Sequence, residues 1–390
     1  MSQFAIFRHY PDLIYLDSAA TCHVPDVVLE AVQHYYQQLH GNVHRGSHRL
    51  GRLATQALEQ AREQLAIFMG APAAQVTLQA STTAALNQLA DHLPVTWQAG
   101  DEIVLSWAEH HANILPWQRL AQRYQLQLKY IEIDPVTGAL GAWEHLLSER
   151  TKVVSVSLAS NVTGAVFAVQ PLLQRAQQLG AWTIVDAAQA AAHVPLRVTE
   201  LGCDALVLSA HKAYGMTGCA PLYLSERLLA QLPPMVVGGG IVEQVSPLSA
   251  SFIDGVQRFE AGSPNTVAIV AAATAVQWLT TQDFTQLQQL RSLLVHELQQ
   301  RPWLTVLPSG ENATPTVAFY STEFHAQDIA IWLDQHDIAV RAGHHCAQLF
   351  LQHWQLPAVV RVSLGIYNTE AHIQRLLQTL DAGWALFSSD

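Results

Sequence analysis

Helical patterns and short apolar runs alternate along roughly the first 225 residues, and few folds accommodate this alternation. Apolar residues recur at helical spacing between Ala54 and Phe68, and Gly70 and Pro72 then supply a stop. Four apolar runs are typical of buried strands, at residues 103–105, 153–158, 183–185 and 206–208. Residues 170–179 lie between two of these runs and predict a crossover helix. The alternation therefore favours an α/β fold with a mostly parallel sheet covered by helices.

The pattern changes after the glycines at positions 238–240. A loop-rich stretch runs to Pro264, and a buried helix is predicted to begin near Val267. From about Phe284 the chain has the pattern of a helix, strands and a final helix. The apolar residues of the final helix share one face: Ile373, Leu376, Leu377, Leu380 and Trp384. We interpret this part as a smaller α+β domain.

The length and the charge disfavour several classes of protein. With 390 residues, two or three domains are expected at about 150 residues per domain. The 20 basic and 31 acidic residues give a net charge of −11, which disfavours a nucleic-acid or anionic-membrane surface. The first eight residues lack the basic-then-apolar pattern of a signal peptide, and residues 267–276 fall short of the ~20 apolar residues that a membrane span needs. We expect a soluble cytoplasmic protein.

The four cysteines are far apart and form no Cys-x-x-Cys pair: Cys22, Cys203, Cys219 and Cys346. A disulfide scaffold and a structural zinc site are therefore disfavoured. Neighbouring histidines on extended chain point in opposite directions, and no His-x-x-x-His helix spacing accompanies them. We expect no metal site.

Lysine is rare in this chain, with only Lys129, Lys152 and Lys212. Lys129 lies where alternation predicts a solvated strand face, and Lys152 flanks a predicted buried strand. Lys212 instead follows the strand pattern of residues 205–209, and ligands of open α/β sheets bind at the carboxyl ends of the strands. A desolvated amine there is suited to form a Schiff base with an aldehyde cofactor.

Pyridoxal phosphate makes further demands that the sequence can meet. Its ring nitrogen needs a carboxylate, and Asp186 ends the strand pattern that starts at residue 183. Its ring needs a flat partner, and His110 follows another strand pattern. Its phosphate needs hydroxyls and helix-terminal amides, which residues 81–83, Ser209 and His211 could supply. The order of these residues on successive strand ends predicts a pyridoxal phosphate site.

These residues carry a family resemblance that covers nearly the whole chain. The sequence resembles the class V aminotransferases, and within them most closely a group II cysteine desulfurase of the SufS/CsdA kind. The matching segments are Tyr15-Leu-Asp-Ser-Ala-Ala20, Gly41-Asn-Val-His-Arg45, Ala108-Glu-His-His-Ala-Asn113, Ser160-Asn-Val-Thr-Gly164, Asp186-Ala-Ala-Gln189, Ser209-Ala-His-Lys-Ala-Tyr-Gly215, Phe259-Glu-Ala-Gly-Ser-Pro-Asn265, Arg341-Ala-Gly-His-His-Cys-Ala347 and Tyr367-Asn-Thr369. The resemblance implies the pyridoxal-dependent transferase fold of type I, with a seven-stranded sheet. It also implies a large domain over residues 13–265 and a small domain made of residues 1–12 and 266–390.

The resemblance also implies roles for individual residues. Lys212 would bind the cofactor's aldehyde, Asp186 would pair with the ring nitrogen, His110 would stack on the ring, and Gln189 would contact the phenolic oxygen. The phosphate would be held by Thr83, Ser209 and His211, with Ser263 reaching it from the other subunit of a homodimer. Asn161 and Arg361 would hold the substrate carboxylate, for which an arginine fork is suited.

Cys346 distinguishes between reactions. A lone cysteine is often only a small buried hydrophobe, but Cys346 lies in a polar, Gly-containing segment with ionisable neighbours that favour the thiolate. The resemblance implies that it takes sulfur from L-cysteine as a persulfide, which leaves L-alanine. The sulfur would then pass to an acceptor protein of the SufE kind, for iron-sulfur cluster assembly or other sulfur metabolism.

Other functions stay open at this point. The chain could be a selenocysteine lyase or another β-eliminating lyase of the same fold. Departures from the family pattern, at Ala80, Ser81, Ala84 and Met216, also leave open a non-catalytic, cofactor-binding scaffold that activates a partner. A hydrolase built on His345 and Cys346 would leave Lys212 and Asp186 unexplained.

Overall fold

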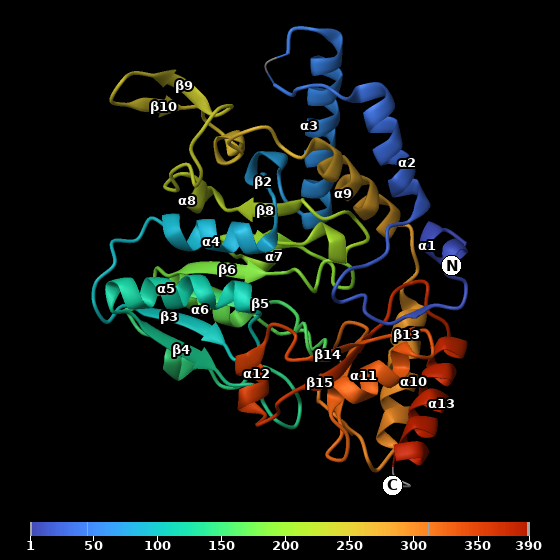
Figure 1. The fold of residues 1–390 in the computed structure, drawn as a ribbon. Coiled ribbons are helices and arrows are strands. Elements are labelled where there is room, and N and C mark those ends of the chain that lie inside the picture. Colours follow the sequence, from blue (N-terminus) through green and yellow to red (C-terminus); the bar gives the residue numbers. More distant parts are fainter. Residues whose placement is uncertain (1, 45, 311, 388–390) are drawn as a thin grey trace.

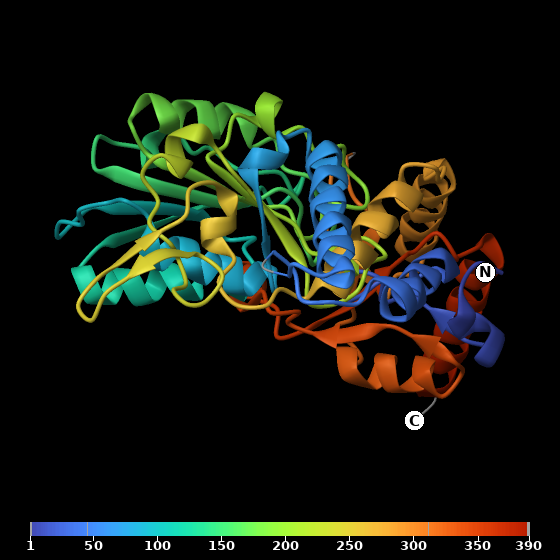
Figure 2. The same ribbon diagram turned by 90° about the horizontal axis from the view of Figure 1, so that it is seen from above.

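The computed structural model describes residues 2–44, 46–310 and 312–387, and its larger part is built around one seven-stranded sheet (Figures 1 and 2). Arg45, which belongs to one of the segments that carry the resemblance, lies outside the described residues. The sheet order is β2 (Val76–Gln79), β8 (Ala220–Leu224), β7 (Ala205–Val207), β6 (Trp182–Asp186), β5 (Thr151–Ser157), β3 (Glu102–Ser106) and β4 (Gln127–Ile131). Within this sheet β8 runs antiparallel to both of its neighbours, β2 and β7, and the other neighbouring pairs are parallel. The predicted α/β class and the mostly parallel seven-stranded sheet are confirmed.

Helices cover both faces of this sheet, which explains why its strands are continuous apolar runs. Ile103 and Leu105 pack toward α4 (Thr82–His92) and α5 (Leu115–Tyr124). Val104 between them packs on the opposite face, with α6 (Gln170–Gln178). The helix predicted at residues 170–179 is therefore present as α6.

Local capping signals fix the ends of two helices on either side of the strand β2. Gly70 ends α3 (Arg49–Met69) in the left-handed conformation, with φ of 66°, as the sequence predicts. At the other end of a short strand, the Ser81 hydroxyl accepts the Ala84 N–H at 3.1 Å and caps α4. The first turn of α4 is thereby fixed beside the carboxyl ends of the strands.

A four-stranded antiparallel sheet forms the centre of the smaller part, in the order β11 (Thr305–Val306), β12 (Thr316–Tyr320), β15 (Val359–Ser363) and β14 (Arg341–Gly343). Its apolar residues pack against α10 (Thr285–Gln299), α11 (Ala326–Asp334) and α13 (Glu370–Phe387). The N-terminal strand β1 (Ile14–Tyr15) pairs in parallel with β13 (Ile338–Ala339), which brings residues after β1 close to the smaller sheet. The expected α+β unit is confirmed, whereas its exact boundaries stay a prediction.

The other elements connect or flank these two parts. The remaining α-helices are α1 (Ala5–His9), α2 (Asp26–His34), α7 (Val198–Leu201), α8 (Glu226–Leu229), α9 (Thr266–Leu279) and α12 (Gln348–His353). Short turns of tighter or wider helix are η1 (Tyr35–Leu39), η2 (Ala73–Gln75), η3 (His111–Asn113), η4 (Glu144–Leu146), η5 (Ala210–Lys212) and η6 (Val256–Phe259). Strands β9 (Val242–Val245) and β10 (Ala250–Phe252) form a hairpin that projects from the body (Figure 1). Within the described residues, no helix has the length and apolar character needed to cross a bilayer.

Candidate active site

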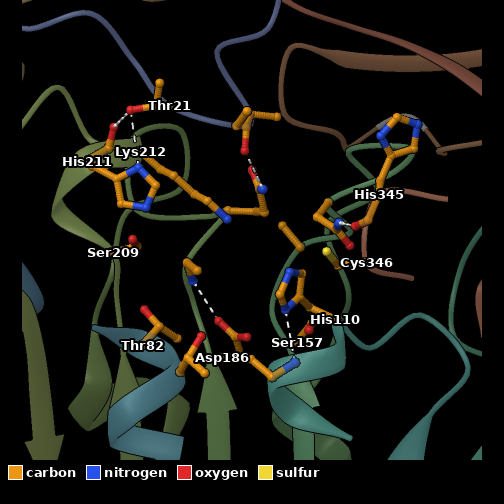
Figure 3. Close-up of a pocket in the computed structure, with 18 of the residues that line it drawn as sticks. Thr21, Thr82, His110, Ser157, Asp186, Ser209, His211, Lys212, His345 and Cys346 are labelled. Carbon is orange, nitrogen blue, oxygen red and sulfur yellow. Dashed lines mark hydrogen bonds between the residues drawn. The ribbon is translucent and has the colours of Figure 1, made fainter. Parts of the chain in front are cut away.

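A cavity of about 380 Å³ lies at the carboxyl ends of the central parallel strands, where the smaller part meets the sheet (Figure 3). Its volume is typical of a small-molecule site. The residues predicted from the sequence that line it are Thr83, His110, Asn161, Asp186, Gln189, Ser209, His211, Lys212, Cys346 and Arg361. Ser263 is the exception, since it is exposed and lines a different pocket together with Tyr35 and His40. The fold thus brings together residues that are up to 278 positions apart in the chain (361 − 83).

Asp186 and Lys212 lie on neighbouring strand ends. Asp186 is the last residue of β6, only 5% exposed, and accepts the Ala188 N–H at 2.9 Å. Burial raises the pKa of Asp186, while the Ala188 N–H and the Lys212 charge oppose that rise. Burial also lowers the pKa of Lys212, which Asp186 opposes. The pair therefore combines a buried carboxylate with an amine that loses its proton more readily than a surface lysine.

The other two lysines have ordinary structural partners. The Lys129 ammonium forms an ion pair with Glu102 at 2.7 Å and is half-buried rather than solvated, because the adjacent strand supplies that carboxylate. Lys152 donates to the backbone oxygen of Glu149 at 3.3 Å. Lys212 is the lysine that lines the cavity.

Hydroxyl groups and helix amides gather at one end of the cavity. Thr83 is exposed in the first turn of α4, while the neighbouring Thr82 hydroxyl donates to the Leu208 oxygen at 3.1 Å and fixes the helix to the sheet. In the same part of the cavity, His211 Nδ1 lies 3.2 Å from the Thr21 hydroxyl. Ser209 completes this end. A helix N-terminus with hydroxyl donors is suited to bind a phosphate.

His110 presents a neutral ring to the cavity (Figure 3). Its Nδ1 accepts the Ala112 N–H at 3.0 Å, so the neutral ring carries its proton on Nε2. Burial, together with the charge of Lys212, lowers the pKa of His110 to about 4. The ring is therefore uncharged at neutral pH, which suits stacking on a flat cofactor.

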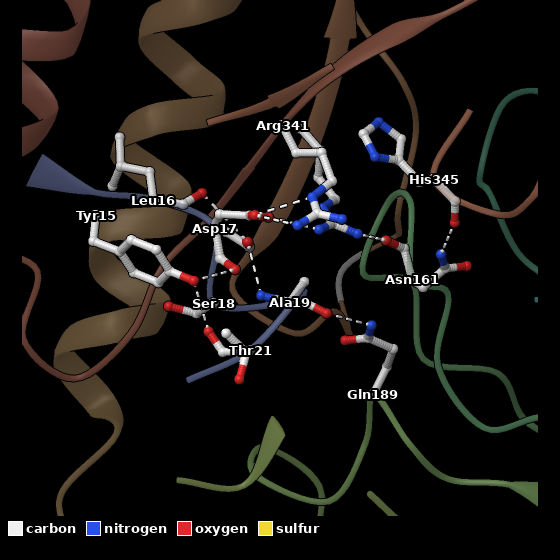
Figure 4. Close-up of polar contacts among 12 residues, drawn as sticks. Tyr15, Leu16, Asp17, Ser18, Ala19, Thr21, Asn161, Gln189, Arg341 and His345 are labelled. Atoms are coloured by element: carbon white, nitrogen blue, oxygen red, sulfur yellow. Dashed lines mark hydrogen bonds and ion pairs between the residues drawn. The ribbon is translucent and has the colours of Figure 1, made fainter. Parts of the chain in front are cut away.

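Arg361 and Asn161 also line the cavity, and Figure 4 shows Asn161 among its polar contacts. Both are buried, and Arg361 Nη1 donates to the backbone oxygen of Asn161 at 2.9 Å. Arg361 Nε and Asn161 Oδ1 have no hydrogen-bond partner among the described residues. Buried polar atoms without partners are costly unless a ligand satisfies them. The Arg361 donor is available to a carboxylate.

Asp17 holds Arg361 and a second arginine, and the sequence reasoning assigned no role to either Asp17 or Arg341. Asp17 Oδ1 accepts from Arg361 Nη2 at 2.8 Å, and Oδ2 accepts from Arg341 Nε at 3.0 Å (Figure 4). Both residues lie in segments that carry the family resemblance, which was the available signal. Their contact joins the segment after β1 to strands β14 and β15, so spacing in the sequence could not reveal it.

Glu109 is a third residue that the sequence reasoning missed. It directly precedes His110 and is fully buried, and its carboxylate accepts from Ser106, Asn113 and Ser157 at 2.5–3.0 Å. Burial raises the pKa of Glu109 to about 7, against these hydrogen bonds. This network ties the segment after β3 to the end of β5.

Cys346 lies on the loop between β14 and α12 and is exposed, whereas Cys22, Cys203 and Cys219 are buried. Burial raises the pKa of each of those three thiols to about 12. Only the Cys346 thiol among the four borders the cavity. The arrangement thus offers one accessible sulfur nucleophile opposite one buried amine.

The family profile described as Aminotransferase class-V matches residues 14–376 of this chain. The chain belongs to the class-V aminotransferase family. It is similar to the probable cysteine desulfurase of Vibrio cholerae, with 40% identity over 94% of this chain and 93% of that protein. It is also similar to the solved structure of the cysteine desulfurase CsdA (S-sulfonic acid) from Escherichia coli, with 31% identity, a TM-score of 0.91, and 99% and 97% of the two chains covered. An apo cysteine desulfurase from Thermococcus onnurineus has 32% identity and a TM-score of 0.90, over 95% and 94% of the two chains.

The cavity of this class-V aminotransferase chain fits pyridoxal phosphate by its own chemistry. A buried carboxylate, a desolvated amine and a neutral imidazole surround its centre, as Asp186, Lys212 and His110. Hydroxyls at a helix N-terminus line it, and so does the Arg361 guanidinium, whose Nε has no partner within the described part of the chain. These are the groups that the ring nitrogen, the aldehyde, the ring face, the phosphate and a substrate carboxylate require.

Proposed function

We propose that this protein is a pyridoxal phosphate-dependent cysteine desulfurase, which converts L-cysteine to L-alanine and keeps the sulfur as a persulfide. One observation carries the proposal. The exposed Cys346 thiol borders the same cavity as the Lys212 amine and Arg361, whose Nε has no hydrogen-bond partner among the residues that the structure describes. An amino acid held by its carboxylate at Arg361 would have its other end within the part of the cavity where an amine and a thiol are both present.

The residues around the cavity support distinct tasks in cofactor binding. Lys212 would hold the aldehyde, Asp186 the ring nitrogen and Gln189 the phenolic oxygen, with His110 against the ring. Thr83, Ser209 and His211 would hold the phosphate. When bound, pyridoxal phosphate supplies an electron-withdrawing ring that takes up negative charge from the substrate carbon.

The substrate is held and activated by other side chains. Arg361 and Asn161 would bind the carboxylate, and Asp17 would keep Arg361 in place. The Lys212 amine, whose pKa is lowered by burial, would move a proton at the substrate Cα. The neutral His110 ring would exclude water from that side of the cavity.

The sulfur step uses Cys346 as a nucleophile. Its thiolate attacks the substrate sulfur, a sulfur–sulfur bond forms, and the substrate Cβ–S bond breaks. L-cysteine and the Cys346 thiol thus give L-alanine and a Cys346 persulfide, with no external oxidant or reductant. The covalent relay divides one difficult transfer into two easier steps.

The persulfide then has to reach an acceptor. An exposed Cys346 supports delivery to a SufE-type acceptor protein, which would approach the open side of the loop. We also propose a homodimer, because Ser263 is exposed and lies outside the cavity of its own chain. In that arrangement Ser263 would contribute to the phosphate site of the other subunit.

The decisive experiment measures alanine formation by the pyridoxal phosphate-loaded wild type and by Cys346→Ala. With L-cysteine and a thiol reductant, we expect Cys346→Ala to be at least about 100-fold slower, because the nucleophile is lost. Its visible absorbance from bound cofactor should equal that of the wild type. Borohydride reduction followed by peptide mapping should label Lys212.

Other outcomes separate the alternatives. If Cys346→Ala forms alanine from L-cysteine as fast as the wild type, Cys346 is not the sulfur carrier. If the wild type is active with L-selenocysteine alone, the protein is a selenocysteine lyase. Bound cofactor without turnover of either substrate, with or without an acceptor protein, would favour the non-catalytic scaffold.

A further inference from the structure

The loop that carries Cys346 has an unusual backbone. His345 and Cys346 both have positive φ, 52° and 55°, so two consecutive residues with side chains lie in the left-handed region. Residues other than glycine rarely adopt this conformation, and it persists only where surrounding contacts hold it. Contacts with neighbouring segments must therefore hold this loop.

Asn161 holds the first of the two strained residues. Its Nδ2 donates to the backbone oxygen of His345 at 2.6 Å, and it projects from the segment after β5. Because Asn161 lies at the proposed carboxylate site, this contact belongs to the machinery already described. It does not reach the Cys346 side of the loop, where the Ala347 N–H donates to the His344 oxygen at 2.8 Å.

His111 holds that other side through two contacts. Its backbone N–H donates to the Cys346 oxygen at 2.8 Å. Its ring Nε2 accepts the backbone N–H of Gln348, the first residue of α12, at 3.3 Å. One residue thus contacts the loop at Cys346 and again two positions later.

His111 belongs to a segment that buried hydrogen bonds hold in place. It begins η3 (His111–Asn113) and follows His110 directly. The base of this segment is anchored by the buried Glu109 carboxylate and by Asn113, which bonds to Ser155 on β5. The residue that contacts the thiol loop is therefore continuous with the residue that faces the cofactor.

We propose that His111 is a positioning residue, which acts through the Cys346 loop to hold the thiol in register with the cofactor side of the cavity. The inference rests on the proposed function, since it gives Cys346 the role of nucleophile. His111 itself does not line the cavity, so its effect on the reaction is indirect. A nucleophile misplaced by a fraction of an ångström reacts more slowly, whereas substrate binding at Arg361 is unaffected.

The contact requires an unprotonated Nε2. Partial burial and the neighbouring His344 ring, with 6.0 Å between the ring centroids, lower the pKa of His111. The neutral ring with its proton on Nδ1 can then accept from Gln348. A glutamine side chain can offer an acceptor at a similar reach, and a leucine cannot.

The test compares His111→Leu, His111→Gln and the matched control His344→Leu, which removes an imidazole from the loop without removing the Gln348 acceptor. Amide hydrogen exchange is measured on the full-length chain without cofactor, in peptides that cover residues 343–350. We expect exchange in His111→Leu to be about fivefold faster, the factor that corresponds to one net hydrogen bond. His111→Gln and His344→Leu should remain close to the wild type.

Steady-state kinetics of the loaded enzyme give the second readout. His111→Leu should lower kcat for L-cysteine about fivefold with an unchanged KM, and His111→Gln should restore it. Unchanged exchange in residues 343–350 of His111→Leu would overturn the inference, whatever the activity. A failure of the proposed function would instead appear as full alanine formation by Cys346→Ala, and the exchange result would be unaffected by it.

Discussion

The strand-end side of the cavity, with Asp186, Lys212 and His110, is called the floor here, and it differs from the loop that carries Cys346 in how it is held. Asp186 is the last residue of a buried strand, and His110 directly follows the buried Glu109, whose carboxylate is hydrogen-bonded. Cys346, in contrast, is exposed on a strained loop that a few hydrogen bonds hold from outside. The residues proposed to bind the cofactor therefore lie at buried strand ends. The thiol that has to pass on its sulfur lies instead on an accessible loop.

Asp17 connects these two regions. Its carboxylate bonds to Arg361 on β15 and to Arg341 on β14, the strand that leads into the Cys346 loop. Arg361 in turn bonds to Asn161, which contacts His345. The carboxylate site and the thiol loop therefore share one polar network, and three variants test how far the two regions act separately.

The largest effect is expected at the floor, for Lys212→Ala. Losing the proton-transfer amine should lower kcat/KM for L-cysteine by about 10³-fold or more. Reaction of the Cys346 thiol with a disulfide reagent should stay at the wild-type rate, because the loop is held by other residues. Lys152→Ala is the control, since Lys152 contacts only the neighbouring Glu149 backbone in the hydrogen bonds described. Substantial alanine formation by Lys212→Ala would contradict the assignment of the amine.

An intermediate effect is expected where the regions meet, for Asp17→Asn. The buried Arg361 would keep its charge without a full counterion, so the free energy of unfolding should fall by about 3 kcal/mol. KM for L-cysteine should rise about tenfold, because the guanidinium is less fixed. The control is Asp26→Asn, which removes the exposed pair with Arg8 and should leave the free energy of unfolding close to that of the wild type. If Asp17→Asn and Asp26→Asn changed the free energy of unfolding and KM equally, Asp17 would not connect the carboxylate site to the Cys346 loop.

A third effect is expected at the buried Glu109 carboxylate, in the pH dependence of stability. Burial raises the pKa of Glu109 from 4.5 to about 7. Between those values the folded chain keeps a proton that the unfolded chain releases. Its contribution to stability is therefore complete below pH 4.5 and is lost as the pH rises to about 7, by up to about 1.4 kcal/mol per pH unit.

Glu109→Gln removes this titration. Urea unfolding at several pH values between 4.5 and 8 should show that the difference in unfolding free energy between variant and wild type grows with pH up to about 7. Glu144→Gln, at an exposed position, should follow the wild type at every pH. A constant difference for Glu109→Gln would mean that the hydrogen bonds from Ser106, Asn113 and Ser157 keep the carboxylate ionised.

Some of the candidate site could be predicted because its signals are local. With three lysines in the chain, a strand-end position singled out Lys212. The same logic placed Asp186 after one parallel strand and His110 after another, because parallel strands end at one edge of the sheet. Glu109 escaped this reasoning because its partner Ser157 lies 48 positions away on β5, and only the packing of the elements buries its carboxylate.

The alternation of apolar runs and helical patterns determined the α/β class and the strand-end location of the cavity, since periodicity and burial act over short distances along the chain. Only the tertiary structure decided that Asp17 meets Arg361, 344 positions later, and that His111 contacts the Cys346 loop. Such contacts depend on how whole elements pack together. Packing brings together segments that are far apart in the chain, and their sequences do not show that they are close in space.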